Sequence, residues 1–315
     1  MQLTRLRAAQ AIAGALVLPS LAQVGRAADL PTLKVAIQPI EPSCQPYYAE
    51  ANGFLDKAGI SVDVTGISTS PVILQALLSG TYDIGSATVT TLALAHIKGL
   101  PIVIIAPQAV VERGVVQGGI VVGASSTIKE AKDLNGKTFA VSGLGTIAEF
   151  VPRAWVDKNG GDSSTMKFTE VPFPTIGDAI AAGRADAGWL NEPFFTIATK
   201  KGQVKLLNTT DDAMPPVYLA TAWFATAAWA KAHPDLVARF ARAMNQAGVW
   251  ANANPDKVVP ILVDKLKADP AMLAIGHRTT FTDKLVNGQI QPLIDIVARY
   301  QKVPTFSASD LIFRG

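Results

Sequence analysis

The sequence predicts an α/β protein of two similar lobes, each with a central mixed β-sheet, joined by a hinge of two chain crossings. Short apolar strands alternate with helices, which is typical of βαβ units. Two stretches also repeat one another 103 residues apart: Pro71 to Asp83-Ile84-Gly85, and Pro174 to Asp186-Ala187-Gly188. Short periods indicate solenoids. A single duplication of this length indicates instead two lobes that face each other across a cleft.

The first lobe should begin with strands and helices in alternation. Ile60–Thr65 alternates apolar and polar residues, which predicts a half-buried strand. Pro71 suits the first turn of a helix, and Gly80 follows that helix's expected end. The expected strands are Leu33–Ile40, Ile60–Thr65, Tyr82–Gly85 and Ile102–Ala106, and the expected helices are Gln45–Lys57, Pro71–Leu78 and Thr90–Lys98.

The second lobe repeats this order, and the chain turns almost wholly helical from His233 onward. His233-Pro234 and Asn254-Pro255 each place proline at the first position of a helix. The expected elements are strands Thr138–Ser142, Lys167–Val171, Ala187–Leu190 and Thr221–Thr226, and helices Thr146–Lys158, Thr175–Ala182, Asp235–Asn252, Asp256–Leu266 and Asp283–Tyr300.

We expect the chain to cross between the lobes near Gln108–Arg113 and near Asn208–Thr221. Lobe 1 then comprises residues 28–110 and 221–315, and lobe 2 comprises residues 111–220. Two crossings permit the lobes to close around a ligand by a hinge motion.

Residues 1–27 have the pattern of a cleaved secretory signal peptide. Arg5 and Arg7 precede the apolar run Ala8–Leu18, and small residues precede the expected cleavage site after Ala27. The run is too short to span a bilayer, which needs about 20 residues. We therefore expect export to the periplasm. No cysteine follows the run, so we expect no lipid attachment.

The charge of the mature chain excludes one class of partner. Three of the 28 Lys and Arg residues lie in residues 1–27, which hold no acid, so 25 basic and 25 acidic residues remain. Binding to nucleic acid or a membrane surface requires a basic stripe. We therefore expect neither partner.

We find no catalytic or metal-binding motif, and expect neither a metal nor another cofactor. His96, His233 and His277 are scattered, without the spacing of a metal site. Cys44 is the only cysteine, so no intramolecular disulfide is possible. It follows the first strand without a nearby His, and we interpret it as a small apolar filler rather than a nucleophile.

The stretch Gly143–Ala148 satisfies the G-x-G-x-x-A dinucleotide fingerprint after a strand. That fingerprint also needs an acidic residue about 20 positions further on, at the end of the next strand. Asp162 lies before that strand and Glu170 lies later than required, so we do not favour a nucleotide site. We predict instead an anion site, in which backbone N–H groups and a helix N-terminus face the cleft and Thr146 caps the helix.

Hydroxyl-rich loops also follow two strands of the first lobe, at Ser68–Ser70 and Ser86–Thr88. Each hydroxyl alone is more typical of a helix N-cap. Ligands of open α/β sheets, however, bind outside the carboxyl ends of the strands, where these loops should lie. Most aromatic residues should be core, but Trp189, just before Asn191-Glu192, is the one most suited to a pocket wall.

Five motifs, in this order along the chain, carry a family resemblance: Gly53–Ile60, Ala76–Gly85, Gly136–Val141, Asn191–Phe194 and Trp250–Pro255. Together with the signal peptide, they resemble the substrate-binding proteins of ABC importers, of the nitrate, aliphatic-sulfonate, taurine and thiamine-precursor (NMT1/THI5-like) type. The resemblance covers almost the entire mature chain. It implies a type II periplasmic binding protein fold without catalysis, a monomer, a small-molecule ligand and an ABC permease as partner.

The resemblance and the loop positions together suggest a set of ligand-binding residues. No Lys or Arg lies in these loops, whereas Glu192 does, so nitrate or a bare sulfonate would rely on N–H groups and hydroxyls. A ligand with a cationic or N–H donor end, or a flat ring, becomes an alternative. The candidates are Gln38, Tyr47, Ser70, Ser86, Thr88, Ser142, Gly143, Gly145, Thr146, Trp189, Glu192 and Trp223, with Pro39 beside them.

The leading hypothesis is therefore an extracytoplasmic binding protein for a small organic molecule, such as a sulfonate, a taurine-like compound or a carboxylate. The alternatives are a binding protein for a pyrimidine or thiamine precursor, an enzyme on the same fold, and a sensory binding domain. No His and Cys pair supports the enzyme.

Overall fold

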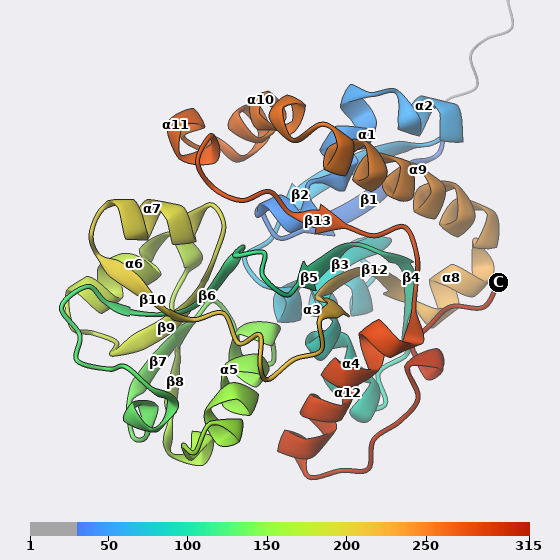
Figure 1. Ribbon diagram of the computed structural model, residues 1–315. Coiled ribbons are helices and arrows are strands. Elements are labelled where there is room, and N and C mark those ends of the chain that lie inside the picture. Colours follow the sequence, from blue (N-terminus) through green and yellow to red (C-terminus); the bar gives the residue numbers. More distant parts are fainter. Residues whose placement is uncertain (1–29) are drawn as a thin grey trace, which may run out of the picture. The chain divides into compact units, whose positions relative to one another are not determined.

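The computed structural model describes residues 30–315, of which residues 31–315 form one compact unit (Figure 1). The predicted signal peptide, residues 1–27, lies outside the described residues. The unit contains two five-stranded sheets and one three-stranded sheet. We call each five-stranded sheet, with the helices that cover it, a lobe.

The sheet of lobe 1 has the strand order β2-β1-β3-β12-β4. Strands β2, β1 and β3 are parallel, whereas β12 is antiparallel to both β3 and β4. The strand after the second crossing thus returns to lobe 1, as the sequence predicted. The strands are β1 (Thr32–Ile37), β2 (Ser61–Gly66), β3 (Ile84–Thr88), β4 (Ile102–Pro107) and β12 (Thr221–Thr226).

The sheet of lobe 2 has the same plan, read in the opposite direction as β8-β7-β9-β6-β10. Strands β8, β7 and β9 are parallel, whereas β6 is antiparallel to β9 and β10. The mixed α/β fold class is therefore confirmed. The strands are β6 (Gly118–Gly123), β7 (Thr138–Val141), β8 (Lys167–Glu170), β9 (Ala187–Asn191) and β10 (Val204–Asn208).

The repeated aspartate has the same structural role in both lobes. In lobe 1, the backbone N–H of Lys34 donates to Asp83 Oδ2 at 2.8 Å, and the N–H of Asp83 donates back to Lys34 O. In lobe 2, Thr138 and Asp186 make the same two bonds, also with 2.8 Å to the carboxylate. Each aspartate thus fixes the register of two parallel strands.

The repeated glycine lets a helix pack closely on its sheet. A Cβ at Gly85 would lie 2.7 Å from Ile73 Cγ2 of helix α3 (Ser70–Leu78). A Cβ at Gly188 would lie 3.1 Å from Ile176 Cγ2 of helix α6 (Phe173–Ala181). At Gly188 the nearest atom would be the backbone oxygen of Ala140, at 2.8 Å. Neither position has room for a side chain, which explains why the motif occurs twice.

The three-stranded sheet, of order β11-β5-β13, lies on the two paths that connect the lobes. The chain runs from β4 through β5 (Ala109–Glu112) to β6, and returns from β10 through β11 (Val217–Leu219) to β12. The C-terminal region adds β13 (Thr280–Phe281) to the same sheet. The predicted lobe limits at residues 110 and 220 fall in or beside these strands, and the limits themselves stay a prediction.

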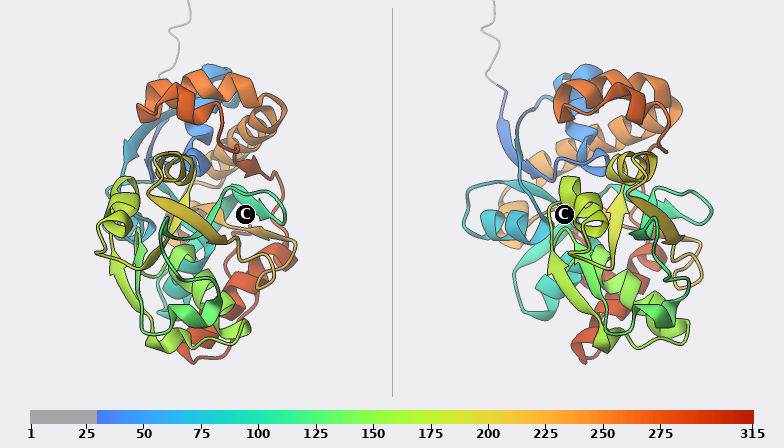
Figure 2. Two further views of the ribbon diagram at one scale, coloured as in Figure 1. Left: turned by 60° about the vertical axis from the view of Figure 1, so that its left-hand side comes forward. Right: turned by 90° about the vertical axis from the view of Figure 1, so that its left-hand side faces the viewer.

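Helices cover both faces of each sheet. Helix α9 packs on α1 and α2, although they lie far apart in the sequence (Figures 1 and 2). The predicted helix Gln45–Lys57 is in fact two helices, because Gly53 adopts a φ of +66° that ends the first. Among residues 30–315, none of the helices has both the length and the apolar character required to cross a membrane. The α-helices are α1 (Gln45–Ala51), α2 (Phe54–Ala58), α3 (Ser70–Leu78), α4 (Val89–Ile97), α5 (Ile147–Lys158), α6 (Phe173–Ala181), α7 (Phe194–Lys200), α8 (Ala227–Ala232), α9 (Pro234–Ala253), α10 (Pro255–Leu266), α11 (Pro270–Leu273) and α12 (Asn287–Gln301), and short 3₁₀ turns cover Glu41–Ser43, Ala131–Leu134, Ser163–Thr165 and Ala308–Asp310.

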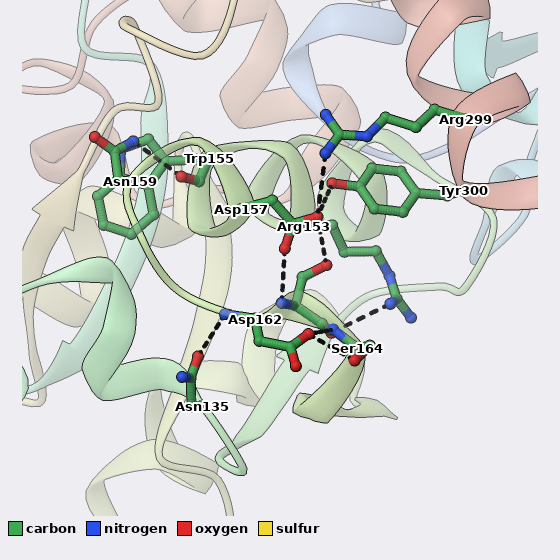
Figure 3. A network of polar contacts seen from close by, with 10 residues as sticks. Asn135, Arg153, Trp155, Asp157, Asn159, Asp162, Ser164, Arg299 and Tyr300 are labelled. Atoms are coloured by element: carbon green, nitrogen blue, oxygen red, sulfur yellow. Dashed lines mark hydrogen bonds and ion pairs between the residues drawn. The ribbon is translucent and has the colours of Figure 1, made fainter.

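The lobes also meet where α12 packs against α5 (Figure 3). Tyr300 Oη donates to Asp157 Oδ2 at 2.6 Å, and Arg299 Nη2 lies 3.8 Å from the same oxygen. The guanidinium of Arg153 lies over the rings of Phe168 and Tyr300. Polar and cation–π contacts thus join the lobes in addition to the three-stranded sheet.

Candidate functional site

A cavity lies between the two lobes, at the carboxyl ends of β1, β3, β7 and β9. We call it the inner cavity. Gln38 follows β1, Thr88 ends β3, Ser142 follows β7 and Asn191 ends β9. This is the position at which open α/β sheets bind ligands. Eight predicted residues line it: Gln38, Ser70, Ser86, Thr88, Ser142, Thr146, Trp189 and Glu192.

Hydroxyl groups form the wall that lobe 1 contributes. Ser86 Oγ donates to Gln108 Oε1 at 2.9 Å and lies 3.0 Å from Ser43 Oγ. Ser70 Oγ accepts from the backbone N–H of Thr88, and Thr88 Oγ1 accepts from Thr91 N and so caps α4. These bonds hold the hydroxyls in place at the cavity surface.

Lobe 2 contributes an aromatic ring, an amide and a carboxylate. Trp189 Nε1 donates to Asn191 Oδ1 at 2.8 Å, which fixes the indole. Glu192 accepts from the hydroxyl and the backbone N–H of Thr196 at 2.8 and 3.2 Å. Glu192 is only 4% exposed. A buried carboxylate retains lone pairs for further donors after these two bonds.

The loop of residues 143–146, which we call the glycine loop, differs from the predicted anion site. The N–H of Leu144 donates to Glu170 Oε1 and the N–H of Gly145 donates to Glu149 Oε2, both at 2.8 Å. Two N–H groups that were expected to face a ligand are therefore occupied by carboxylates of the same lobe. Thr146 does not cap α5 with its side chain, because its hydroxyl donates to Gly143 O at 2.7 Å.

Gly143 and Gly145 do not line the inner cavity, and instead let the lobes approach each other. A Cβ at Gly143 would lie 3.2 Å from the side chain of Thr69 in lobe 1. Gly145 has a φ of +75°, which favours glycine, and its carbonyl accepts from Thr91 Oγ1 of lobe 1 at 3.0 Å. The glycine loop thus forms a seam between the lobes.

Two predicted aromatic residues also lie away from the inner cavity. Trp223 is fully buried, edge-on to Phe240 with 5.2 Å between ring centroids, and donates to Gln45 Oε1 at 2.6 Å. Tyr47 is partly exposed, with Lys265 Nζ 5.2 Å from its ring centroid. Nothing in the local sequence separates these core and surface positions from pocket positions.

Several lining residues were not predicted, and the repeat could have found some of them. Phe173 and Asn191 both line the inner cavity, and lie 103 residues after Ser70 and Thr88, which were predicted. Trp189 lies at the same spacing from Ser86. Other lining residues that were not predicted include Ser43, Gln117, Asp211, Tyr218, Thr221 and Thr279.

No Lys, Arg or His is among the described residues that line the inner cavity, whereas Glu192 and Asp211 are. Behind the lining, Glu41 Oε2 lies 3.5 Å from Arg278 Nη1, and Glu41 Oε1 accepts from Thr279 N at 3.2 Å. Burial raises the pKa of Glu41 to about 7, against the opposing effects of Arg278 and the Thr279 N–H, and Glu192 raises it further.

Cys44 is not exposed to the cavity. Its side chain is fully buried, and its thiol donates to Ile40 O at 3.4 Å. Burial raises the pKa of this thiol well above its usual range, and Glu41 raises it further. A thiol in this environment stays protonated and therefore acts as a small apolar side chain. Within residues 30–315, no three His, Cys, Asp or Glu side chains form a group suited to a metal ion.

Two lobes of this topology around a cavity at the strand ends define a class of protein among solved structures. The aliphatic sulphonate binding protein SsuA of Escherichia coli aligns with a TM-score of 0.71 and 18% identity, covering 90% of this chain and 92% of that chain. The nitrate-binding protein NrtA of Synechocystis PCC 6803 aligns with a TM-score of 0.74 and 16% identity, covering 90% and 84%. The desulfurization enzyme DszB aligns with a TM-score of 0.62 and 15% identity, covering 89% and 95%. The fold is that of the periplasmic binding proteins.

The family follows from the sequence. The model of the family described as "NMT1/THI5 like" matches residues 43–258, and the chain belongs to this family. The formylaminopyrimidine-binding protein of Halalkalibacterium halodurans is 24% identical over 220 residues, which cover 69% of this chain and 64% of that relative. The predicted fold and family resemblance are confirmed.

Proposed function

We propose that this chain is the extracytoplasmic solute-binding protein of an ABC importer and holds a small organic molecule in the inner cavity. The observation that carries the proposal is that equivalent positions of both lobes line one cavity at the strand ends. A ligand in that place contacts both lobes at once. Such a ligand binds more tightly when the lobes are closed around it than when they are apart, and it therefore stabilises the closed arrangement.

The ligand, in this proposal, carries N–H donors or a positive charge at one end and a flat or apolar part beside Trp189. Glu192 offers a buried carboxylate, and the hydroxyls of lobe 1 can donate or accept. Nitrate or a bare sulfonate would meet a described lining without cationic side chains. Amino-sulfonates and pyrimidine precursors fit the proposal better, because both carry N–H donors.

The proposal contains no chemical step. The described lining of the inner cavity has neither Cys nor His, and Cys44 is buried behind it. Export to the periplasm through residues 1–27, docking to a membrane permease and a monomeric state complete the proposal. They are supported by the leader pattern and by the names of the structural relatives.

The test is to identify what the protein retains. Mature protein from the periplasm of its own host is analysed by native mass spectrometry, before and after denaturation, dialysis and refolding. We expect a retained small molecule that is lost on refolding and raises the melting temperature when added back, since a ligand at 100 times its Kd stabilises by about 2.7 kcal/mol. A turnover product in place of a retained compound would contradict the proposal and favour the enzyme.

A further inference from the structure

A second recess opens beside the inner cavity, between the loops that follow β1 and β8. We call it the outer recess. Lobe 1 contributes Pro39 and Thr69 to its lining, and lobe 2 contributes Val171, Pro172 and Phe194. Residues of both lobes form it, as they form the inner cavity.

The outer recess adjoins the inner cavity. Four residues line both spaces: Gln38, Ile40, Ser142 and Phe173. The space that the centres of water molecules can occupy is about 80 Å³ in the inner cavity and about 320 Å³ in the outer recess. One water needs about 10–15 Å³ on this measure. The inner cavity therefore suits a compact group, and the outer recess offers room for the rest of a larger ligand.

The walls of the outer recess are mostly apolar and rigid. Pro39, Pro172 and Pro174 lie at its exposed rim, and proline side chains have little conformational freedom to lose on binding. Phe173 stacks on Phe194, with 5.8 Å between ring centroids and 5° between ring planes.

Two of the five polar side chains that line the outer recess are engaged within the protein. Gln38 Nε2 donates to Ser68 O at 2.9 Å. Glu170, the only charged residue of the described lining, accepts from Leu144 N. The hydroxyls of Ser68, Thr69 and Ser142 remain available to a polar ligand group, and an apolar group would displace water from the apolar walls, which is favourable.

We propose that the outer recess is a specificity subsite, which takes an aromatic or branched aliphatic group of the same ligand whose polar end lies in the inner cavity. This inference rests on the proposed function, because it assigns the second part of the same ligand. It defines the ligand as a two-part molecule, with a compact polar end inside and an apolar end between Pro39 and the Phe173–Phe194 pair.

The recess can be tested without knowing the polar end, with the neutral apolar fluorophore N-phenyl-1-naphthylamine. We expect a saturable rise in fluorescence with wild-type protein, and at least tenfold weaker binding to the double variant Pro39→Ser/Pro172→Ser. Phe194→Ala gives a second test from the other wall. Pro304→Ser is the matched control, because Pro304 is exposed and lines neither space. Far-UV circular dichroism checks that each variant is folded. Equal binding to the double variant and to Pro304→Ser, or no saturable rise, would overturn the inference.

Matched ligand pairs then separate this inference from the proposed function. Methylamine and benzylamine, methanesulfonate and benzenesulfonate, and 4-aminopyrimidine with and without a 5-benzyl group are compared by calorimetry. In the class that binds, we expect the arylated member to bind at least tenfold tighter, and this advantage to vanish in the double variant. If both members of a pair bind equally, the assignment of the outer recess as a specificity subsite is wrong and the proposed function stands. If no pair binds, the proposed ligand class is wrong, and the fluorophore result alone decides the subsite.

Discussion

In both lobes, the strand that follows the repeated aspartate ends at the inner cavity, yet the two strands bring different chemistry to it. Lobe 1 places Ser86 and Thr88 there, and lobe 2 places Trp189 and Asn191 at the equivalent positions 103 residues later. The helices that precede these two strands, α3 and α6, differ as well, since Phe173 of lobe 2 is equivalent to Ser70 of lobe 1. At these equivalent positions lobe 1 therefore presents hydroxyls, whereas lobe 2 presents aromatic rings and an amide.

The difference separates framework from specificity. The aspartate bonds and the closely packed glycines are the same in both lobes, because two parallel strands and a helix need them wherever this unit occurs. The residues at the strand ends carry no such constraint and have diverged. Substitutions that disturb the framework of one lobe at a time, or that replace residues that differ between the lobes, test this separation.

The largest expected effect concerns Glu41, which has no buried carboxyl counterpart in the glycine loop of lobe 2. Its pKa is raised from 4.5 to about 7. The folded state then binds the Glu41 proton more tightly than the unfolded state does. The stabilisation that this proton contributes is fully present below about pH 4.5 and is lost as the pH rises through about 7. Glu41→Gln should remove up to about 3 kcal/mol of this pH dependence.

Urea unfolding at pH 5 and pH 8 measures the effect. Glu50→Gln is the control, because Glu50 is exposed and pairs only with Lys265 at the surface. If wild type and Glu41→Gln lost equal stability between the two pH values, Glu41 would not be the responsible group.

The close-packed glycines come next. In Gly188→Ala the new methyl group meets the carbonyl oxygen of Ala140 in a neighbouring strand, which cannot rotate away. In Gly85→Ala it meets the side chains of Ile73, Leu77 and Phe224, which can shift. We expect losses of about 3 and about 2 kcal/mol of unfolding free energy.

Chemical denaturation of both variants tests this order. Gly288→Ala should leave stability unchanged or raise it, since nothing lies near its Cβ position and it is in a helix. If Gly85→Ala were the more destabilising of the two, the packing argument for lobe 2 would be wrong.

The contact between α12 and α5 tests how far the lobes act as one unit (Figure 3). Burial raises the pKa of Tyr300, and its bond to Asp157 raises it further, so the phenol stays a donor. Burial alone would raise the pKa of Asp157, but hydrogen bonds from Tyr300 and Ser163 lower it. Tyr300→Phe removes one charge-assisted hydrogen bond and should lower stability by about 1.5 kcal/mol.

Thermal unfolding measures this loss, with Tyr82→Phe, which alters a partly buried tyrosine of lobe 1, as the control. An unchanged melting temperature for Tyr300→Phe would show that the bond across the lobes contributes nothing net.

The smallest expected effect concerns the repeated aspartates. Asp83→Ala and Asp186→Ala each remove the acceptor of one strand N–H near the surface. We expect each to lower stability by about 1 kcal/mol. Equal losses, measured by urea unfolding, would support one shared role, and a difference above about 1 kcal/mol would show that the lobes use the motif differently.

The sequence predicted the framework well, because the repeat and the strand–helix alternation depend on local pattern. It missed β5, β11 and β13, which are two to four residues long and are set by pairing with distant segments. It also missed β6 and β10 of the lobe 2 sheet and the short helices α7, α8 and α11. It also missed that Gly53 divides a helix.

The site was predicted less completely, because tertiary contacts decide which side chains face the cavity. Trp223 became core through Phe240 and Gln45, which come from elsewhere in the chain. The occupied N–H of Gly145 could have been anticipated, since Thr146-Ile147-Ala148-Glu149 has the spacing of a capping box, which turns a glutamate back toward the helix start. The bond from Leu144 to Glu170 could not, because it joins separate segments.

The most direct test of the central claim is calorimetric titration of wild type, Ser86→Ala and Glu192→Gln with taurine, 4-aminopyrimidine, methanesulfonate and nitrate. Glutamine at position 192 can still accept from Thr196, so the fold should be retained. We predict that a compound with N–H donors binds to wild type. Its affinity for Glu192→Gln should be lower by about tenfold or more, and its affinity for Ser86→Ala should also be lower. Binding of nitrate or methanesulfonate alone, unchanged in both variants, would contradict the account.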